Sequence, residues 1–265
     1  MNQDQVRTRL LQIENSEEYF SLIFSGKASK KVDGLYHPDK REIIIHNKNM
    51  STDNEIIYTA IHEYAHHLQF TRSVVPVSTR VHSSSFWNLF HRLLGKAEEK
   101  GLYNNIFKTD RDFIELTAKI KKDFLAENGR MMKELGKILI EAVALCRSKN
   151  VSFEDYVDRE LNLHRTAART LIKISSLDVP PDIGYENMKT ISRIKSYEER
   201  QMAEKAFLNG ESPDMVRAVI GNPQENNPEP LRQLYCEKER IERTLANLKI
   251  RLSKIEQSID KIKTH

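Results

Sequence analysis

Apolar residues recur at helical spacing along most of the chain, and strand-like patterns are confined to one short region. Residues 2–25 carry apolar side chains at the intervals of a helix, and Gly26 provides a usual end for it. Residues 32–36 and 42–46 flank a His-Pro-Asp turn, and the run Glu-Ile-Ile-Ile-His of the second segment is the clearest strand in the sequence. From residue 109 onward only helical patterns occur. The sequence therefore predicts an α+β fold whose strands lie near the N-terminus.

The segment from Asp53 to Phe70 reads as one helix with an apolar first half, and it contains His-Glu-Tyr-Ala-His at residues 62–66. Histidines four residues apart lie one above the other on a helix, so the imidazoles of His62 and His66 can bind one metal ion. Glu63 follows the first histidine directly, where the zinc-peptidase motif places its general base. Paired histidines on a helix are often ordinary surface or core residues. Here the residues just before His62 are mostly apolar, which favours a buried helix with a metal site.

A second histidine-containing stretch supplies a candidate third ligand. Catalytic zinc usually takes three protein ligands and leaves a fourth position open. His82 follows His66 by sixteen residues and precedes an amphipathic segment, 84–99, whose first serines are typical of a helix N-cap. A histidine just before a helix that returns beside the first helix is well placed to complete the site. His67 projects about 100° away from His66 around the helix, so it cannot bind the same ion without distortion.

Together, the two stretches resemble a known family. The SprT-like zinc peptidases and their YgjP-type relatives show His-Glu-x-x-His followed by His-Ser-x-x-Phe-Trp or a close variant. Here residues 62–66 and 82–87 carry these two parts. The resemblance covers about residues 30–100, and the two parts together are more specific than either one alone.

This resemblance implies a small zincin-like domain, built of helices and a short sheet. It implies that His62, His66 and His82 bind Zn²⁺ and that Glu63 is the catalytic base. In zincins an edge strand beside the metal helix can hold an extended substrate by strand addition. The backbone of residues 42–46 could act in this way while its isoleucines pack in the core.

The helical region contains a candidate helix-turn-helix. A short helix from Ser152 to Leu161, a turn at residues 162–163 and a second helix from His164 to Ser175 form this arrangement. In it, the second helix offers its N-terminal side chains to the major groove of DNA. An ordinary helical hairpin would show the same pattern. The residues that we expect to face DNA are Arg165, Thr166 and Arg169.

Residues 162–167 are similar to the Leu-Ser-x-x-Thr-Ala stretch of helix-turn-helix domains in ParB-type partition proteins and phage regulatory proteins. A later segment, 210–217, loosely matches the Gly-x-Ser-x-x-x-Val-Arg turn and helix of those domains, so the resemblance covers about residues 130–220. It implies a DNA-binding module. The sequence departs from the pattern at His164, where a serine is usual. Residues 106–227 also carry 20 basic and 20 acidic groups, hence no net charge.

The last part of the chain has a heptad pattern of about five repeats. The seam positions are Leu231, Leu234, Lys238, Ile241, Leu245, Leu248, Leu252, Ile255, Ile259 and Ile262. Such a helix must pair with another, and docking on residues 110–147 is the alternative to a homodimer. In a parallel pair Arg251 would meet Glu256, but Glu237 would face Glu242, so these charges leave the orientation open. We expect the homodimer to form through Leu234, Ile241, Leu248 and Ile255.

Composition narrows the class of protein and its location. Of 265 residues, 39% are hydrophobic and 30% charged, and the mean hydropathy is −0.59. No apolar run reaches the length of a membrane span, and the N-terminus lacks the features of a signal peptide. Cys146 and Cys236 form no C-x-x-C pair, so neither a zinc ribbon nor a disulfide framework is indicated. We expect a cytoplasmic protein, associated with the nucleoid if it binds DNA, and the mild net charge of +4 leaves DNA binding to local patches.

The sequence thus predicts three parts. Residues 1–105 form a SprT-like zincin metallopeptidase domain, residues 106–225 an all-α, helix-turn-helix-like domain, and residues 226–265 a coiled-coil tail. The predicted function is that of a zinc-dependent endopeptidase acting on protein substrates associated with DNA, such as DNA-bound or crosslinked proteins or a repressor. Zinc is inferred from the three histidines, and another divalent metal could use the same ligands.

The alternative is a DNA-binding regulator or segregation-type factor whose metallopeptidase core is structural or degenerate. Glu63 argues against it, because a purely structural metal site has no use for a carboxylate beside the first ligand. For catalysis, Glu63 would take a proton from water and later give it to the leaving amine. Tyr36 and Tyr58 are the candidates for stabilising the oxyanion, on weaker grounds than the ligands.

Overall fold

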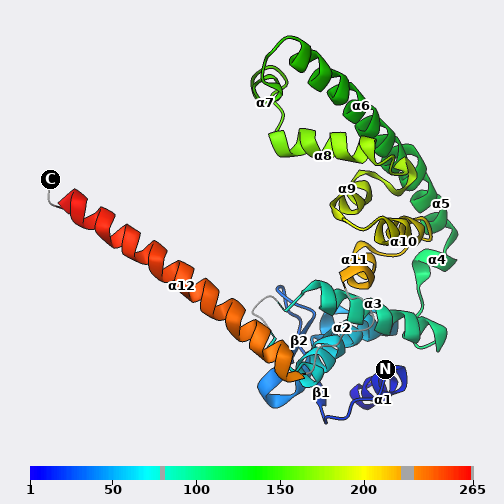
Figure 1. Ribbon diagram of the computed structural model, residues 1–265. Coiled ribbons are helices and arrows are strands. Elements are labelled where there is room, and N and C mark those ends of the chain that lie inside the picture. Colours follow the sequence, from blue (N-terminus) through cyan, green and yellow to red (C-terminus); the bar gives the residue numbers. More distant parts are fainter. Residues whose placement is uncertain (78–80, 222–229, 264–265) are drawn as a thin grey trace. The chain divides into compact units, whose positions relative to one another are not determined.

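The computed structural model describes residues 1–77, 81–221 and 230–263, and helices predominate in all but the N-terminal region (Figure 1). Contacts divide the chain into two compact units. The first contains residues 1–93 and the C-terminal residues from 223 onward, and the second contains residues 94–222. The coarse expectation of an α+β fold is confirmed, whereas the expected domain boundaries at residues 105 and 225 stay predictions.

The first unit holds a three-stranded sheet with the order β1-β3-β2. Strand β3 (Glu42–Ile45) pairs in parallel with β1 (Ser21–Phe24) and antiparallel with β2 (Gly34–His37). The two strands expected around the His-Pro-Asp turn are therefore present. The expectation that β3 lies at an edge is wrong, since both of its edges are paired. Within the described part of the chain, the outer edge of β2 pairs with no strand.

The helix expected over residues 2–25 is wrong in its second half. Helix α1 covers Gln3–Ile13, begins with a capping box formed by Asn2 and Gln5, and ends at Glu14. Residues 21–24 form β1 instead. A short apolar run fits a buried strand as well as a helix, so periodicity alone could not separate the two.

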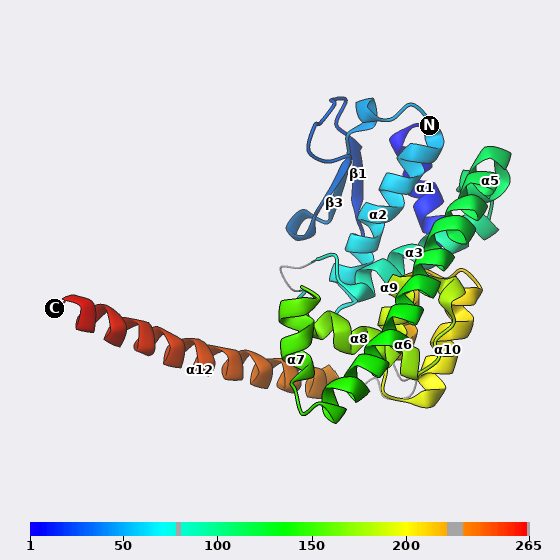
Figure 2. The same cartoon turned by 90° about the horizontal axis from the view of Figure 1, so that it is seen from above.

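Helix α2 (Asp53–Arg72) is the central element of the first unit and lies alongside the strands (Figure 2). Its start is fixed by a capping box between Thr52 and Glu55. It packs against β2, β3 and α1, and the hydroxyl of Tyr64 donates a 2.6 Å hydrogen bond to the carbonyl oxygen of Glu14. The largest fully buried side chains of this unit are Tyr64, Phe20, Phe86, Phe90, Leu10, Ile13, Ile43, Ile45, Ile57, Ile61, Leu68 and Leu93.

Helix α3 (Ser84–Glu99) has the bounds that its amphipathic pattern predicts. Ser83 caps it, since its hydroxyl accepts from the amide of Phe86 at 3.4 Å. Arg92 of α3 and Arg72 of α2 both pair with the carboxylate of Glu14. Glu14 thereby links the middle of α3 to the C-terminal end of α2.

In its described residues, the second unit consists of helices and connecting loops and contains no strand. A continuous helix runs through α5 (Arg111–Lys119), a π-helical segment η3 (Ile120–Ala126) and α6 (Glu127–Ser148). The helix continues through residues 128–129 without a break. Gly129 permits close packing, because an added Cβ would lie 2.3 Å from the carbonyl oxygen of Pro181.

Two short elements and one longer helix form the predicted helical hairpin. α7 (Phe153–Asp155) continues into η4 (Tyr156–Glu160), Asn162 makes the turn with φ of 50°, and α8 (Arg165–Ser176) packs against α6. The remaining elements of the unit are α4 (Ile106–Thr109), η5 (Pro181–Ile183), α9 (Tyr185–Arg193), α10 (Tyr197–Leu208) and α11 (Pro213–Gly221).

The C-terminal helix α12 (Pro230–Lys263) contains 34 residues. Residues 222–229, which precede it in the sequence, lie outside the described residues. The described apolar side chains of its heptad seam are all exposed, from 39% for Leu234 to 77% for Ile262. In the part of the chain that the structure covers, no helix is long and apolar enough to cross a membrane.

Candidate metal centre

Two of the predicted ligands lie on one face of α2. His62 and His66 are one helical turn apart, and their ring centroids are 5.1 Å from each other. The preceding turns bury Ile57, Ala60 and Ile61 completely, so the sheet side of α2 is fixed by apolar packing. The two imidazoles are thereby directed to a defined side of the helix.

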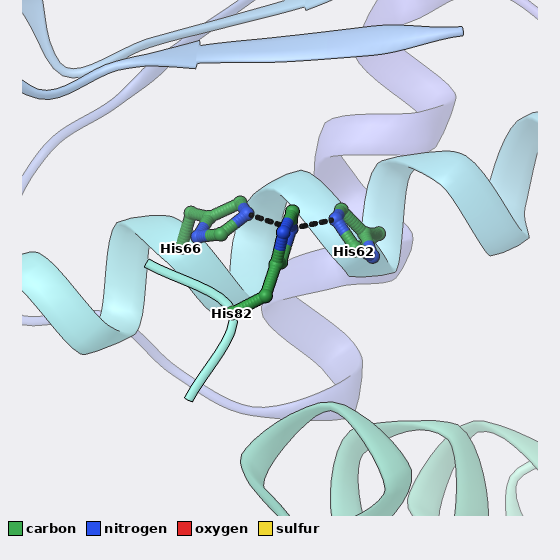
Figure 3. Close-up of side chains that lie close together, drawn as sticks. All are labelled: His62, His66 and His82. Carbon is green, nitrogen blue, oxygen red and sulfur yellow. Dashed lines mark hydrogen bonds between the residues drawn. The ribbon is translucent and has the colours of Figure 1, made fainter. Parts of the chain in front are cut away.

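The third histidine comes from the segment just before α3. Its Nε2 atom lies 3.0 Å from Nε2 of His62 and 3.1 Å from Nε2 of His66. Figure 3 shows His82 reaching from a separate segment to a point between the two helical histidines. One ligand atom from each of the three residues lies within 4.8 Å of the others. The structure therefore brings together the three histidines that the sequence singled out.

This arrangement suits a bound cation. The Nε2 atom of His82 carries either one proton or one lone pair, so it can form a proper hydrogen bond with only one of its two close nitrogen neighbours, and the other contact is left repulsive. A cation among the three nitrogens removes that repulsion. Four-coordinate zinc, with Zn–N distances of roughly 2.0–2.1 Å, would space its ligand nitrogens about 3.3 Å apart, close to the distances found here. Three histidines could thus hold a metal ion, with room for a fourth ligand.

An aromatic wall from α3 fixes the orientation of the imidazoles. Phe86 stacks on His66 with ring centroids 4.2 Å apart, and Trp87 stacks on His82 at 5.6 Å. Phe90 contacts the edge of His62 at 5.2 Å. The Phe-Trp pair that follows His82 in the sequence therefore supports the ligands. As the only tryptophan of the chain, Trp87 also offers a fluorescence reporter beside the site.

Burial sets the protonation states of the site. It lowers the pKa of His62 to about 4, with a further contribution from His82, and it lowers the pKa of His66 to about 4, with contributions from both neighbouring histidines. Neutral imidazoles are the form that binds metal. Burial also raises the pKa of Glu63 to about 7, so its carboxyl group is suited to exchange protons near neutral pH.

Glu63 lies against strand β2, and a glycine makes this approach possible. A Cβ atom at Gly34 would lie 2.8 Å from both Cγ and Oε1 of Glu63 and 2.8 Å from Cγ2 of Thr59. Gly34 was not among the residues predicted from the sequence. A glycine inside a strand often marks the close approach of a ligand or another chain segment, and this signal could have identified it.

A pocket of about 520 Å³ joins these features. Its wall includes the three histidines and Glu63, together with residues of β2 and the segment that precedes it. Leu35, which is 41% exposed, contributes an apolar side chain from β2. The pocket therefore places the histidine cluster beside β2, whose outer edge pairs with no strand in the part of the chain that the structure describes.

His67 takes no part in the cluster, as expected. It is completely buried, and its Nδ1 atom lies 3.1 Å from the hydroxyl of Tyr36 while its Nε2 atom lies 2.9 Å from the hydroxyl of Ser16. Burial raises the pKa of Tyr36 to about 12. Because the Tyr36 hydroxyl already contacts His67, Tyr36 is a weaker candidate for stabilising an oxyanion. Tyr58 lines the pocket and stays a candidate.

The residues expected to face DNA form contacts within the helical hairpin. Arg165 pairs with Asp158, and Arg169 pairs with Glu154 at 2.9 Å. The hydroxyl of Thr166 lies 3.2 Å from Nδ1 of His164. The charges of the two arginines are thus balanced by carboxylates of the preceding helix, a feature that no local sequence pattern indicated.

The chain matches no family model, no curated protein and no solved structure.

Gln69 lies one turn beyond His66 on α2 and is a candidate for orienting its ring. The Nδ1 atom of His66 and the Oε1 atom of Gln69 are both buried without a hydrogen-bond partner. The Gln69 side chain nevertheless approaches His66 closely enough to raise its pKa, against the larger effect of burial. An N–H at Nδ1 donating to Oε1 would satisfy both atoms and leave Nε2 free for a metal.

Gln69→Leu is therefore expected to lower the affinity of the site for a divalent metal by about 10- to 100-fold, the usual cost of losing a partner that orients a ligand. Gln69→Glu is expected to raise the affinity, because a carboxylate accepts the same N–H more strongly. Chelator competition measures both, and the melting temperature of the metal-free variants checks the fold. Equal affinities for wild type and Gln69→Leu would show that Gln69 does not orient His66.

Proposed function

We propose that this protein is a zinc-dependent endopeptidase that cleaves polypeptides bound in an extended form. The observation that carries the proposal is the meeting of three imidazole nitrogens and one buried carboxylic acid in a single pocket. A purely structural histidine site would need no such carboxyl group. The resemblance of residues 62–66 and 82–87 to SprT-like peptidases supports the same function.

The residues present fit a zinc ion. His62, His66 and His82 would hold it as neutral imidazoles, which agrees with the lowered pKa values of the two helical histidines. When bound, zinc supplies Lewis acidity, which polarises a peptide carbonyl and makes water acidic enough to lose a proton near neutral pH. The aromatic side chains of α3 keep the ligands in place and exclude water from one side of the site.

Glu63 is proposed to move the proton. Its carboxylate accepts a proton from the attacking water, and the resulting acid donates that proton to the amine that leaves when the peptide bond breaks. A pKa near 7 suits both steps, because the group is neither too weak a base nor too weak an acid at neutral pH. Contact with Gly34 limits the space around Glu63 and so favours one position of its carboxyl group.

The proposed substrate is a segment of polypeptide in extended conformation. The outer edge of β2 is unpaired in the described residues and borders the pocket, so a substrate could add to it as a further strand. In this role β2 replaces β3, whose backbone is fully paired. The exposed side chain of Leu35 offers an apolar contact to the bound segment.

Proteins associated with DNA are the narrower substrate class that we propose from the sequence. The helical hairpin of residues 153–176 supports DNA binding by its arrangement, while the ion pairs of Arg165 and Arg169 reduce the charge available for phosphate contacts. The alternative, a DNA-binding regulator with a structural metal site, would show salt-dependent DNA binding without peptide cleavage. No feature of the described residues favours that alternative over a peptidase.

Metal removal tests the function directly. Protein stripped with a chelator is expected to leave casein intact, and addition of one equivalent of zinc is expected to restore cleavage. Titration of zinc should change Trp87 fluorescence, because this ring stacks on His82. Stoichiometric zinc binding without cleavage of casein or of DNA-bound proteins would support the structural alternative, and cleavage that persists in the stripped protein would contradict the proposal.

A further inference from the structure

Helix α12 carries two rows of apolar side chains that nothing in the described residues covers. With Leu231 at heptad position a, Leu245, Leu252 and Ile259 occupy the same position in later repeats. Position d holds Leu234, Ile241, Leu248, Ile255 and Ile262. All of these side chains are between 39% and 77% exposed. A seam of this length, with an apolar a and d row, is the pattern of a coiled coil.

We propose that the occupant of this seam is α12 of a second copy, paired in parallel and in register. The seam consists only of residues of α12, so this pairing does not depend on the proposed peptidase activity. Helix α12 is thereby the dimerisation element of the protein.

A second copy fits the seam better than the helix of residues 111–148 does. That helix also exposes a row with a seven-residue period, at Phe124, Met131, Ile138 and Leu145. The positions three residues after the first three are Glu127, Glu134 and Glu141. Over residues 124–145, one apolar row beside a row of glutamates cannot fill the holes of a two-row seam, whereas α12 presents both rows to its own copy along its length.

Lys238 selects the parallel orientation. It is the one polar residue of the seam and occupies position a of the second repeat. In parallel register it meets Lys238 of the second copy, so the seam has a single polar layer. In an antiparallel pair that overlaps the whole seam, Lys238 would lie opposite Ile255, and this mismatch would occur twice. A polar residue at one a position is a known determinant of register.

The charges beside the seam agree with this orientation. In parallel register Arg251 of each copy lies beside Glu256 of the other, which gives two attractive pairs. Glu237 and Glu242 of the two copies also come together, but Lys238 lies between them. Within one helix its ammonium group is already 3.7 Å from Glu242. The two Lys238 side chains of the dimer thus place two positive charges among the four carboxylates of Glu237 and Glu242.

Lys238 also limits the number of helices that can associate through the seam. Leucine at a with isoleucine at d favours assemblies of three or four helices. In a two-stranded coil the a side chains lie nearer to solvent, so a lysine can extend its ammonium group to water and to Glu242. Lys238→Ile removes this limit and is expected to give a more heat-stable assembly of higher mass than the dimer.

The mass of the full-length protein in solution tests the proposal, by light scattering or sedimentation at tens of micromolar. We expect twice the 30.9 kDa of one chain. Leu248→Glu, in the seam, is expected to weaken dimerisation at least a hundredfold and to give the monomer mass. Ile250→Glu is the matched control, because Ile250 is 57% exposed on the same helix but lies off the seam. A monomeric wild type, or equal effects of the two variants, would overturn the proposal.

Disulfide crosslinking tests the orientation. In a Cys236→Ser background, Ile259→Cys is expected to form a covalent dimer under mild oxidation, since parallel register places the two cysteines in one layer. In the antiparallel pair these positions would be 25 residues apart along the helices, about 38 Å at 1.5 Å per residue. Absence of the crosslink in a protein of dimer mass would exclude the parallel arrangement, and a tetramer mass would exclude the dimer.

Discussion

Glu63→Gln is expected to lower the rate of peptide cleavage by about 10²- to 10⁴-fold, the usual contribution of a general acid–base residue. The amide has nearly the same shape as the carboxylic acid, so the contact with Gly34 and the packing of α2 should persist. What the amide lacks is the ability to accept a proton from water and return it to the leaving amine. The measurement is kcat/KM for a peptide substrate with zinc-saturated protein.

Metal content separates this effect from damage to the site. Zinc should remain at one per chain in Glu63→Gln, because the three ligands are untouched. Glu17→Gln provides the matched control, since it removes one carboxylate from an exposed position of the same unit. Cleavage by Glu63→Gln at more than a tenth of the wild-type rate would show that another group moves the proton.

His82→Ala is expected to abolish stable zinc binding. The change leaves two imidazoles on α2 and removes the one nitrogen that lies within 3.1 Å of both. The loss of affinity should exceed the roughly 10- to 100-fold cost of losing an orienting partner, because a ligand itself is removed. Metal analysis after dialysis should find one zinc per wild-type chain and less than a tenth of that in the variant.

His91→Ala is the matched control for this experiment. His91 lies on α3, and its ring centroid is 6.3 Å from that of Trp87. It therefore belongs to the same group of aromatic side chains but lies outside the histidine cluster. It should keep one zinc per chain. Full zinc occupancy in His82→Ala would show that the third ligand is not His82, and equal losses in both variants would point to a disturbed helix α3.

The parts of the site that could be predicted from the sequence depend on interactions between residues close together in the chain, such as helix caps and helical spacing. The start of α2 follows from the capping box of Thr52 and Glu55, and the bounds of α3 follow from its amphipathic pattern. Histidines four residues apart on a helix must share a face. The place of His82 beside them could be predicted because α3 has to bury its apolar face, and α2 is the nearest helix in the sequence.

The parts that were missed depend on contacts between distant residues. Nothing in the run from Ser21 to Phe24 distinguishes a strand from a helical turn, and the decision depends on pairing with β3. The order of the sheet likewise depends on which strand meets which, so the sequence suggested the wrong edge. The ion pairs of Arg165 and Arg169 with acidic residues of the preceding helix have the same origin.

Among the described residues the outer edge of β2 is unpaired, and this has a consequence for the choice of substrate by the proposed peptidase. A strand edge recognises the main chain, which every polypeptide possesses, so it discriminates weakly between side chains. What it does require is a segment of a few residues whose own amide and carbonyl groups are not already engaged in a fold. A protease with such an entrance selects its targets by their folding state: a well-packed neighbour is spared, and the same protein becomes a substrate once a loop or terminus has come loose.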